Sequence, residues 1–160
     1  MGFFDKAKKF LGGHGVKVQH VEIERQEPGS VSLPIGDTVV KGKFLISADD
    51  DAEVLSMRSE FVMSFTNDDG MEVAEILGAD TFPDEYTSRS DDMLQYPFTL
   101  KGGETVEDFF IISMDEADIP TALENSGVEL SQVRFFVRTE VDVKGSPFDP
   151  ECSDDITIVE

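Results

Sequence analysis

The chain has 160 residues, enough for one domain with a sizeable core, and it carries a formal net charge of −21. A surface this acidic repels nucleic-acid phosphates and anionic lipids, so both are poor partners for the body of the domain. The single cysteine, Cys152, cannot form an intramolecular disulfide. No apolar run is long enough for a membrane span or a signal-peptide core, so the sequence favours a cytoplasmic protein.

Residues 1–13 predict an N-terminal amphipathic helix that differs from the rest of the chain. Apolar residues recur there at helical spacing, three lysines occupy the other positions, and Gly12 and Gly13 end the segment. The expected partner-binding residues of this segment are Phe3, Phe4, Lys8, Phe10 and Leu11. We expect the helix to dock on its own domain, or on a second copy in a homodimer formed by helix exchange. A docking helix for another protein and a membrane-surface anchor remain as alternatives.

Residues 14–160 predict a β-sandwich, because alternating apolar and polar positions recur between turn signals. From Val16 to Ile23 the alternation changes phase, which predicts a β-bulge near Gln19 and His20. In residues 38–47 one face carries Val40, Gly42, Phe44 and Ile46, and the other carries Lys41 and Lys43. Gly42 within a strand predicts a bend or a close backbone approach.

The longest alternation covers residues 53–66 and is followed by the hairpin turn Asn67–Gly70. Five of its residues are predicted to face inward: Leu55, Met57, Phe61, Met63 and Phe65. Four are predicted to face outward: Arg58, Glu60, Ser64 and Thr66. A partner strand is expected over 71–77, and residues 78–92 read as a loop.

Further strands are predicted around Phe98 and over 106–114, where the apolar centre FFIIS indicates a strand buried on both faces. One short helix is expected between Asp115 and Ser131. The segment 133–143 predicts a long strand at the centre of its sheet, with Phe135, Val137 and Val141 buried. A Pro/Asp corner then leads into a last short strand around Ile156 and Ile158.

No catalytic or cofactor-binding arrangement is evident in the sequence. His14 and His20 lack Cys or Glu partners at zinc spacing, and no glycine loop or nucleophile elbow is present. The carboxylates near Cys152 are expected to raise the pKa of its thiol and make it a poor nucleophile. We therefore expect a protein that is not an enzyme.

The acidic loops supply the only alternative for a metal site. Aspartates in loops at one end of a sandwich can bind calcium, although no segment fits the twelve-residue calcium loop. The residues of this weaker alternative are Asp49, Asp51, Asp68, Asp149 and Asp154.

Three segments resemble the arrestin-like sporulation-control family, the type named after sporulation protein M of stage zero. The turn Pro34-Ile35-Gly36-Asp37, followed by Val39 and Gly42, is similar to the corresponding turn of arrestin-like domains. The segment FFVRTEVDVKGSPFDPECSDDITIV looks like the last two strands of the family and the corner between them. The start, GFFDKAKKFLGGHGVKV, resembles its glycine-ended N-terminal helix.

The resemblance implies an immunoglobulin-like, arrestin-type all-β sandwich with a short N-terminal helix. It also implies an adaptor or regulator that acts through protein–protein interaction and needs no cofactor. The runner-up is a calcium-dependent binding module built on the acidic loops. The chain departs from the family at Phe109–Met114, where members carry a proline-rich segment, and members usually continue into a second sandwich.

Overall fold

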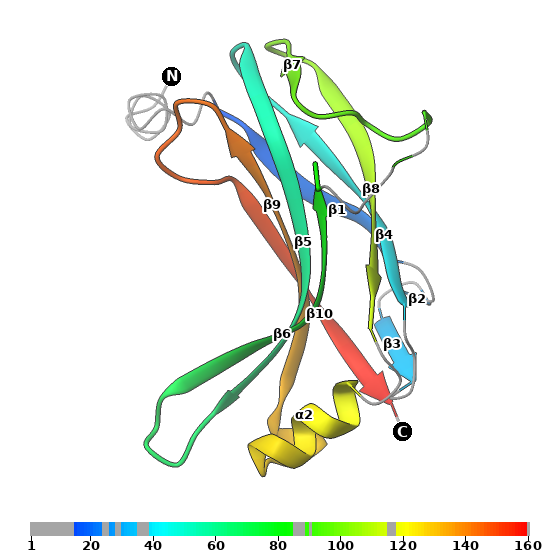
Figure 1. Ribbon diagram of the computed structural model, residues 1–160, viewed down its shortest axis with the longest axis vertical. Coiled ribbons are helices and arrows are strands. Elements are labelled where there is room, and N and C mark those ends of the chain that lie inside the picture. The colour runs from blue at the N-terminus through cyan, green and yellow to red at the C-terminus, as the bar shows by residue number, and fades with distance from the viewer. Residues whose placement is uncertain are drawn as a thin grey trace.

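The computed structural model describes residues 15–23, 26–27, 30–34, 39–84, 89, 91–114 and 118–159. It is built almost entirely of β-strands in two sheets (Figure 1). The smaller sheet has the order β1-β4-β8. Its strands are β1 (Lys17–Ile23), β4 (Val39–Ser47) and β8 (Thr105–Ser113).

The larger sheet has the order β2-β3-β10-β9-β5-β6, and β7 pairs with β5 outside this path. Its strands are β2 (Gln26–Glu27), β3 (Ser30–Pro34), β5 (Ala52–Thr66), β6 (Glu72–Phe82), β7 (Phe98–Leu100), β9 (Arg134–Val143) and β10 (Glu151–Val159). The pairs are antiparallel except for β10 with β3, which is parallel. The helix α2 (Asp118–Ser126) lies at the end of the sandwich near β6, and a 3-10 turn covers Leu130–Gln132. The prediction of an all-β sandwich is confirmed.

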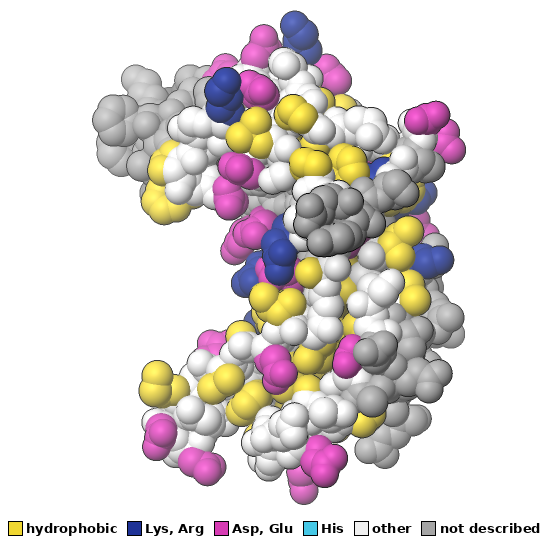
Figure 2. Space-filling view, in the orientation of Figure 1, with side chains coloured by type: hydrophobic (Ala, Val, Ile, Leu, Met, Phe, Trp, Pro, Cys, Tyr) yellow, Lys and Arg dark blue, Asp and Glu magenta, His cyan; other side chains and the backbone are white. Residues whose placement is uncertain are grey.

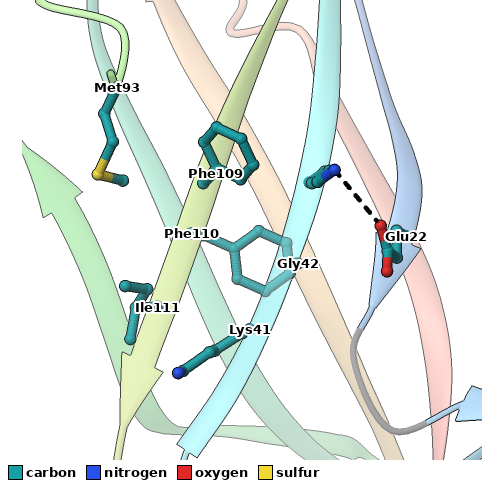
Figure 3. A pocket seen from close by; sticks show the side chains of 8 residues that line it. Glu22, Lys41, Gly42, Met93, Phe109, Phe110 and Ile111 are labelled. Atoms are coloured by element: carbon teal, nitrogen blue, oxygen red, sulfur yellow. Dashed lines mark ion pairs between the residues drawn. The ribbon is translucent and has the colours of Figure 1, made fainter. Parts of the chain in front are cut away.

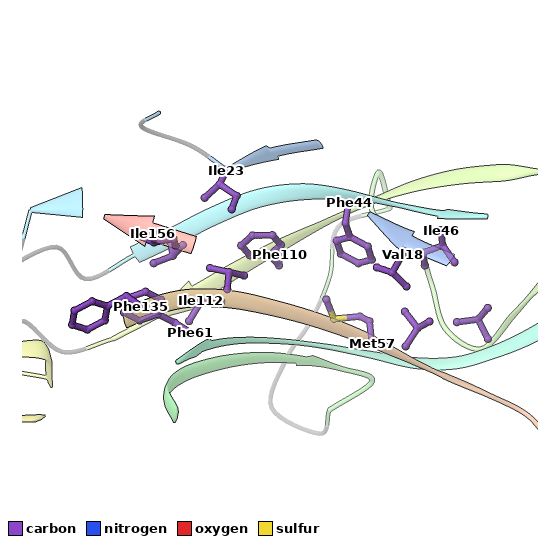
Figure 4. Close-up of a cluster of buried hydrophobic side chains, with 14 of the residues drawn as sticks. Val18, Ile23, Phe44, Ile46, Met57, Phe61, Phe110, Ile112, Phe135 and Ile156 are labelled. Carbon is purple, nitrogen blue, oxygen red and sulfur yellow. The ribbon is translucent and has the colours of Figure 1, made fainter. Parts of the chain in front are cut away.

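The core lies between the facing sides of the two sheets. Phe44 and Phe110 come from the smaller sheet, and Met57, Phe61 and Val137 come from the larger one (Figure 4). All five side chains are at most 1% exposed. Fully burying a side chain of this size contributes about 1.5–3 kcal/mol, so these five together contribute about 7–15 kcal/mol.

The predicted central strand is confirmed, because β9 lies between β10 and β5. Its inward residues Phe135, Val137 and Val141 are all buried. The turn Asn67–Gly70 also forms as predicted, since the Asn67 side-chain oxygen accepts hydrogen bonds from the backbone N–H groups of Asp69 and Met71. The short helix predicted after Asp115 is α2.

The close approach predicted at Gly42 is confirmed. A Cβ atom at this position would lie 2.5 Å from the carbonyl oxygen of Glu22 and 2.5 Å from the Phe110 ring. The bulge predicted in β1 is also present, but it lies between His20 and Glu22. Ile23 is buried and Val21 remains exposed, so only one of these two residues joins the core.

Three predictions about strands are wrong. The segment 78–92 is not all loop, because β6 continues to Phe82. Val54, and not Leu55, is buried, because a register irregularity between Val54 and Ser56 shifts the alternation. Glu60 and Ser64 face outward as predicted, yet both are buried rather than solvated.

The third wrong prediction concerns β8, which is not buried on both faces. Phe110 and Ile112 are fully buried, whereas Ile111 is 47% exposed and Phe109 is half-buried. One face of this apolar strand is therefore open to solvent, and the candidate site lies there.

Candidate functional site

A pocket opens on the outer face of the smaller sheet (Figure 3). It has a volume of about 350 Å³, near the lower end of the range for ligand pockets. Its lining includes side chains of Glu22 of β1, Lys41 and Lys43 of β4, Met93 before β7, and Phe109 and Ile111 of β8. In contrast to the two lysines of the pocket, Asp and Glu side chains are spread widely over the visible face of the molecule (Figure 2).

The period of two in β4 and β8 explains how these side chains come together. Val40, Phe44 and Ile46 point into the core, so Lys41 and Lys43 between them point outward. In β8 the pairing of Lys41 with Ile111 and of Lys43 with Phe109 places each lysine beside an apolar side chain on the same face. The pocket thus combines two ammonium groups and the Glu22 carboxylate with an apolar wall.

The two lysines differ in their surroundings. The Lys43 Nζ atom lies 3.7 Å from a carboxylate oxygen of Glu22 and 5.5 Å from the centre of the Phe109 ring. No ion pair joins Lys41 to another residue in the part of the chain that the structure describes. Lys41 therefore offers an ammonium group to a ligand without first breaking a described ion pair.

Two backbone groups on the free edge of β8 beside this pocket are hydrogen-bonded to side chains. The Ile111 N–H donates to the carboxylate of Asp80 at 2.9 Å, and the Phe109 carbonyl accepts from the guanidinium of Arg89 at 2.6 Å. These two backbone groups would otherwise pair with an added strand. A ligand at this face finds these two backbone groups occupied, whereas the side chains of the pocket are open to it.

Arg89 belongs to a buried ionic network. Its side chain is 2% exposed and lies 2.8 Å from the carboxylate of Asp108, which is fully buried. The Tyr96 hydroxyl also donates to Asp108, at 2.7 Å, and burial together with that carboxylate raises the pKa of Tyr96. The guanidinium lies over the rings of Phe82 and Tyr96. These partners hold Arg89 and Tyr96 against β8.

A second polar network joins the two sheets. The His20 side chain of β1 is 3% exposed, with Nδ1 at 2.6 Å from the Asp154 carboxylate and Nε2 at 2.7 Å from the Thr139 hydroxyl. Thr139 also lies 2.7 Å from the hydroxyl of Ser59. Burial lowers the pKa of His20, and the hydrogen bond to Asp154 opposes that shift only in part. The neutral ring therefore donates from Nδ1 to Asp154 and accepts at Nε2 from Thr139.

This Asp154–His20–Thr139 order looks like a nucleophile–base relay, but it has no access for a substrate. Thr139 and Ser59 are both 0% exposed, so neither hydroxyl can reach an external carbonyl group. Burial is the main reason that the pKa of the nearby Cys152 thiol is raised to about 11. The carboxylates of Asp154 and Glu151 also contribute to this rise in pKa. The direction agrees with the prediction that Cys152 is a poor nucleophile.

The structure does not bring the five aspartates of the calcium alternative together. Asp51 lies where β5 begins and accepts a hydrogen bond from the Gly102 N–H, whereas Asp68 lies beyond the other end of this 15-residue strand. At about 3.3 Å per residue these ends are roughly 50 Å apart. Asp154 contacts His20 between the sheets. Among the described residues no group of three metal-binding side chains could hold an ion.

The predicted partner-binding residues Phe3, Phe4, Lys8, Phe10 and Leu11 lie outside the described residues, as does the whole predicted helix 1–13. In the described part of the chain no helix has the length and apolar character needed to cross a bilayer.

Sequence reasoning did not find the pocket, the His20 network or the Arg89–Asp108 pair. The alternation of β4 gave one usable signal, because it placed Lys41 and Lys43 on one outward face. Nothing in the sequence showed that Phe109 and Ile111 would share that face with them.

Comparisons with known proteins place the fold. No family model matches the sequence, and no curated protein matches it. An alkylpurine DNA glycosylase, AlkC of Pseudomonas fluorescens, aligns over 94% of this chain and 32% of its own at 11% identity, but its TM-score of 0.43 carries no argument. The crystal structure of Spo0M, a sporulation control protein of Bacillus subtilis, aligns with a TM-score of 0.62 at 14% identity. The alignment covers 91% of this chain, which spans about half of Spo0M, so this chain has a fold similar to that of a sporulation control protein.

Proposed function

We propose that this chain is a non-enzymatic regulatory adaptor of the arrestin-like sporulation-control type, acting in the cytoplasm by binding other proteins. The observation that carries the proposal is the similarity in fold to Spo0M over 91% of the chain. A fold alone does not fix function, so the proposal also depends on the chemistry of the site.

The described side chains support binding better than catalysis. The hydroxyl groups nearest to His20 are sealed in the core, and the thiol of Cys152 has a raised pKa. The open features are a pocket with lysines and apolar side chains, and a few exposed apolar residues such as Phe148 and Met71. Such features recognise a protein partner through shape and charge, without a chemical step.

The predicted helix 1–13 is the first candidate for a partner contact. Its Phe3, Phe4, Phe10 and Leu11 are too apolar to remain in water without a binding surface, and its three lysines would be attracted to an acidic one. In this proposal the helix binds a partner protein, or binds its own domain until a partner displaces it.

The test is an affinity purification from the source cell, followed by reconstitution of the complex from purified proteins. The baits are the full chain and a variant lacking residues 1–12, each with calcium and with a calcium chelator. We expect a defined protein that binds the full chain equally in both conditions and binds the shortened chain more weakly. Strict dependence on calcium, or turnover of a small-molecule substrate by the purified chain, would refute the adaptor.

A further inference from the structure

We propose that the lysine-containing pocket on β4 and β8 binds the β9–β10 turn of a second copy of this chain. Phe148 of that turn enters the pocket, and Asp149 faces Lys41 and Lys43. The contact joins different surfaces of two copies, so it is a head-to-tail association. The inference stands apart from the adaptor proposal, because it concerns the chain with itself.

The β9–β10 turn presents an apolar side chain in an acidic setting. Phe148 is 66% exposed, and Asp149 and Glu151 follow it closely in the sequence. A phenyl ring next to a carboxylate complements a pocket with an apolar wall next to ammonium groups. The Lys41 ammonium group has no described ion pair to lose, and Phe109 and Ile111 supply the apolar contact.

The turn is held in a fixed shape before binding. Gly145 has a φ of 78°, a left-handed conformation that glycine adopts readily. The Ser146 N–H donates to the Val143 carbonyl, and its hydroxyl donates to the Phe148 carbonyl at 2.7 Å. A preorganised turn loses less entropy on binding than a flexible one does.

Phe148 cannot fill the pocket of its own chain. Figure 1 shows the β9–β10 turn on one side of the molecule and β4 and β8 on the other. Strand addition at the edge of β8 would have to displace Asp80 and Arg89, which already bond the Ile111 N–H and the Phe109 carbonyl. Insertion of a side chain from another copy is the contact that these features allow.

The net charge determines when the contact forms. Two copies at −21 repel each other over the Debye length, which is about 10 Å at 0.1 M salt and 3 Å at 1 M. The local attraction acts over a few ångströms and is supported by apolar burial. We therefore expect self-association of the full chain to increase as salt rises, the reverse of a contact made by charge alone.

The first experiment uses a fluorescent peptide with the sequence of residues 145–151, GSPFDPE, and measures its polarisation with the full chain. We expect binding to fall about tenfold or more when the phenylalanine of the peptide is replaced by alanine. The Lys41→Glu/Lys43→Glu variant should lose binding. The matched control is Lys17→Glu/Lys101→Glu. Each double variant loses two lysines and gains two glutamates, so both change the net charge from −21 to −25. Equal binding by the pocket variant and the control would overturn the proposal.

The second experiment measures sedimentation of the full chain at about 1 M NaCl. Phe148→Ala should sediment as a monomer, whereas Met71→Ala, which removes a similarly exposed residue from another acidic turn, should associate like the parent. A mixture of Phe148→Ala with Lys41→Glu/Lys43→Glu should form dimers and nothing larger, because each pair retains one intact turn and one intact pocket. If the peptide binds but the chain stays monomeric, the second copy is the wrong occupant.

Discussion

Two ion pairs of similar length separate the effect of burial from the effect of distance. Arg89 and Asp108 lie 2.8 Å apart and are at most 2% exposed, whereas Arg134 and Asp155 lie 2.6 Å apart and are 54% and 68% exposed. Removing one partner of a buried pair leaves an uncompensated charge and costs about 3–5 kcal/mol. An exposed pair contributes about 0–1 kcal/mol.

We therefore expect Asp108→Ala to lower the free energy of unfolding by about 3–5 kcal/mol, and Asp155→Ala by less than about 1 kcal/mol. Urea unfolding followed by circular dichroism measures both. Equal losses would show that the interior near Arg89 is wetter than its burial indicates.

Val137 gives a second test at this scale, because it is fully buried at the centre of β9. Val137→Asp places an unpaired carboxylate in the core, which costs several kcal/mol, comparable with the stability of the whole domain. We expect the variant to be unfolded at room temperature by circular dichroism. The control is Asp142→Asn on the exposed face of the same strand, expected to change stability by about 0.5 kcal/mol or less. An unchanged melting temperature for Val137→Asp would contradict the inward assignment.

His20 makes stability depend on pH with a defined sign. Its folded-state pKa is lowered below the ordinary value of 6.5, mainly by burial. Between that lowered pKa and 6.5 the unfolded chain binds more protons than the folded chain, so protonation favours unfolding. The contribution of His20 to the free energy of unfolding is therefore complete above pH 6.5, and it falls as the pH decreases through 6.5.

Other groups titrate at lower pH, so the test compares two proteins. Burial raises the pKa values of Asp80 and Asp149, whose effect on stability has the opposite sign. We expect the stability difference between the parent and His20→Gln to shrink from pH 7.5 to pH 5.5, by at most about 1.4 kcal/mol per pH unit. Urea titrations across this range measure the difference. A difference that stays constant would show that His20 does not change its protonation within the folded state.

At the scale of elements, β8 is an edge strand whose open side is protected by side chains. The Asp80 carboxylate accepts the Ile111 N–H, although no strand pairs on that side. In the antiparallel pair with β4, neighbouring residues point their N–H groups to opposite sides. Asp80 therefore protects the Ile111 amide alone, while β4 protects Phe110 and Ile112.

We expect Asp80→Ala to speed hydrogen exchange at the Ile111 amide by about tenfold, the effect of losing one hydrogen bond to a charged group. The Phe110 and Ile112 amides are the internal controls and should keep their exchange rates. Amide exchange followed by NMR gives all three rates in one experiment. Uniform acceleration of the three would instead indicate loss of the whole strand.

The sequence predicted elements well where one face of a strand is buried. The alternation in β4 and β9 identified the inward residues, since a period of two assigns each side chain to one face. The alternation failed in β5, because a register irregularity makes Val54 the buried residue instead of Leu55. It also failed for β8, because an apolar run carries no alternation and cannot show that Ile111 faces solvent.

The polar networks could not be predicted, because they depend on contacts between distant residues. His20 contacts Asp154 across 134 positions and Thr139 across 119 positions, and Arg89 contacts Asp108 across 19 positions. Strand pairing brings these residues together, and the apolar periodicity of a single strand does not predict which strands will pair. The candidate pocket has the same origin, since it needs β1, β4 and β8 side by side.

At the scale of the whole molecule, the charge of −21 makes every cation a potential stabiliser. Salt screens the repulsion between carboxylates, so sodium, magnesium and calcium should all raise the melting temperature. A specific calcium site would add to this effect, by about 2.7 kcal/mol at a concentration 100 times its dissociation constant.

Because Asp51, Asp68 and Asp154 lie at different places in the fold, we expect no such addition. Melting curves in calcium chloride should coincide with those in magnesium chloride at the same concentration. Sodium chloride at matched ionic strength should raise the melting temperature less, since divalent ions accumulate more strongly around carboxylates. A calcium curve displaced several degrees beyond the magnesium curve would restore the calcium module, and single Asp→Asn variants would then locate its ligands.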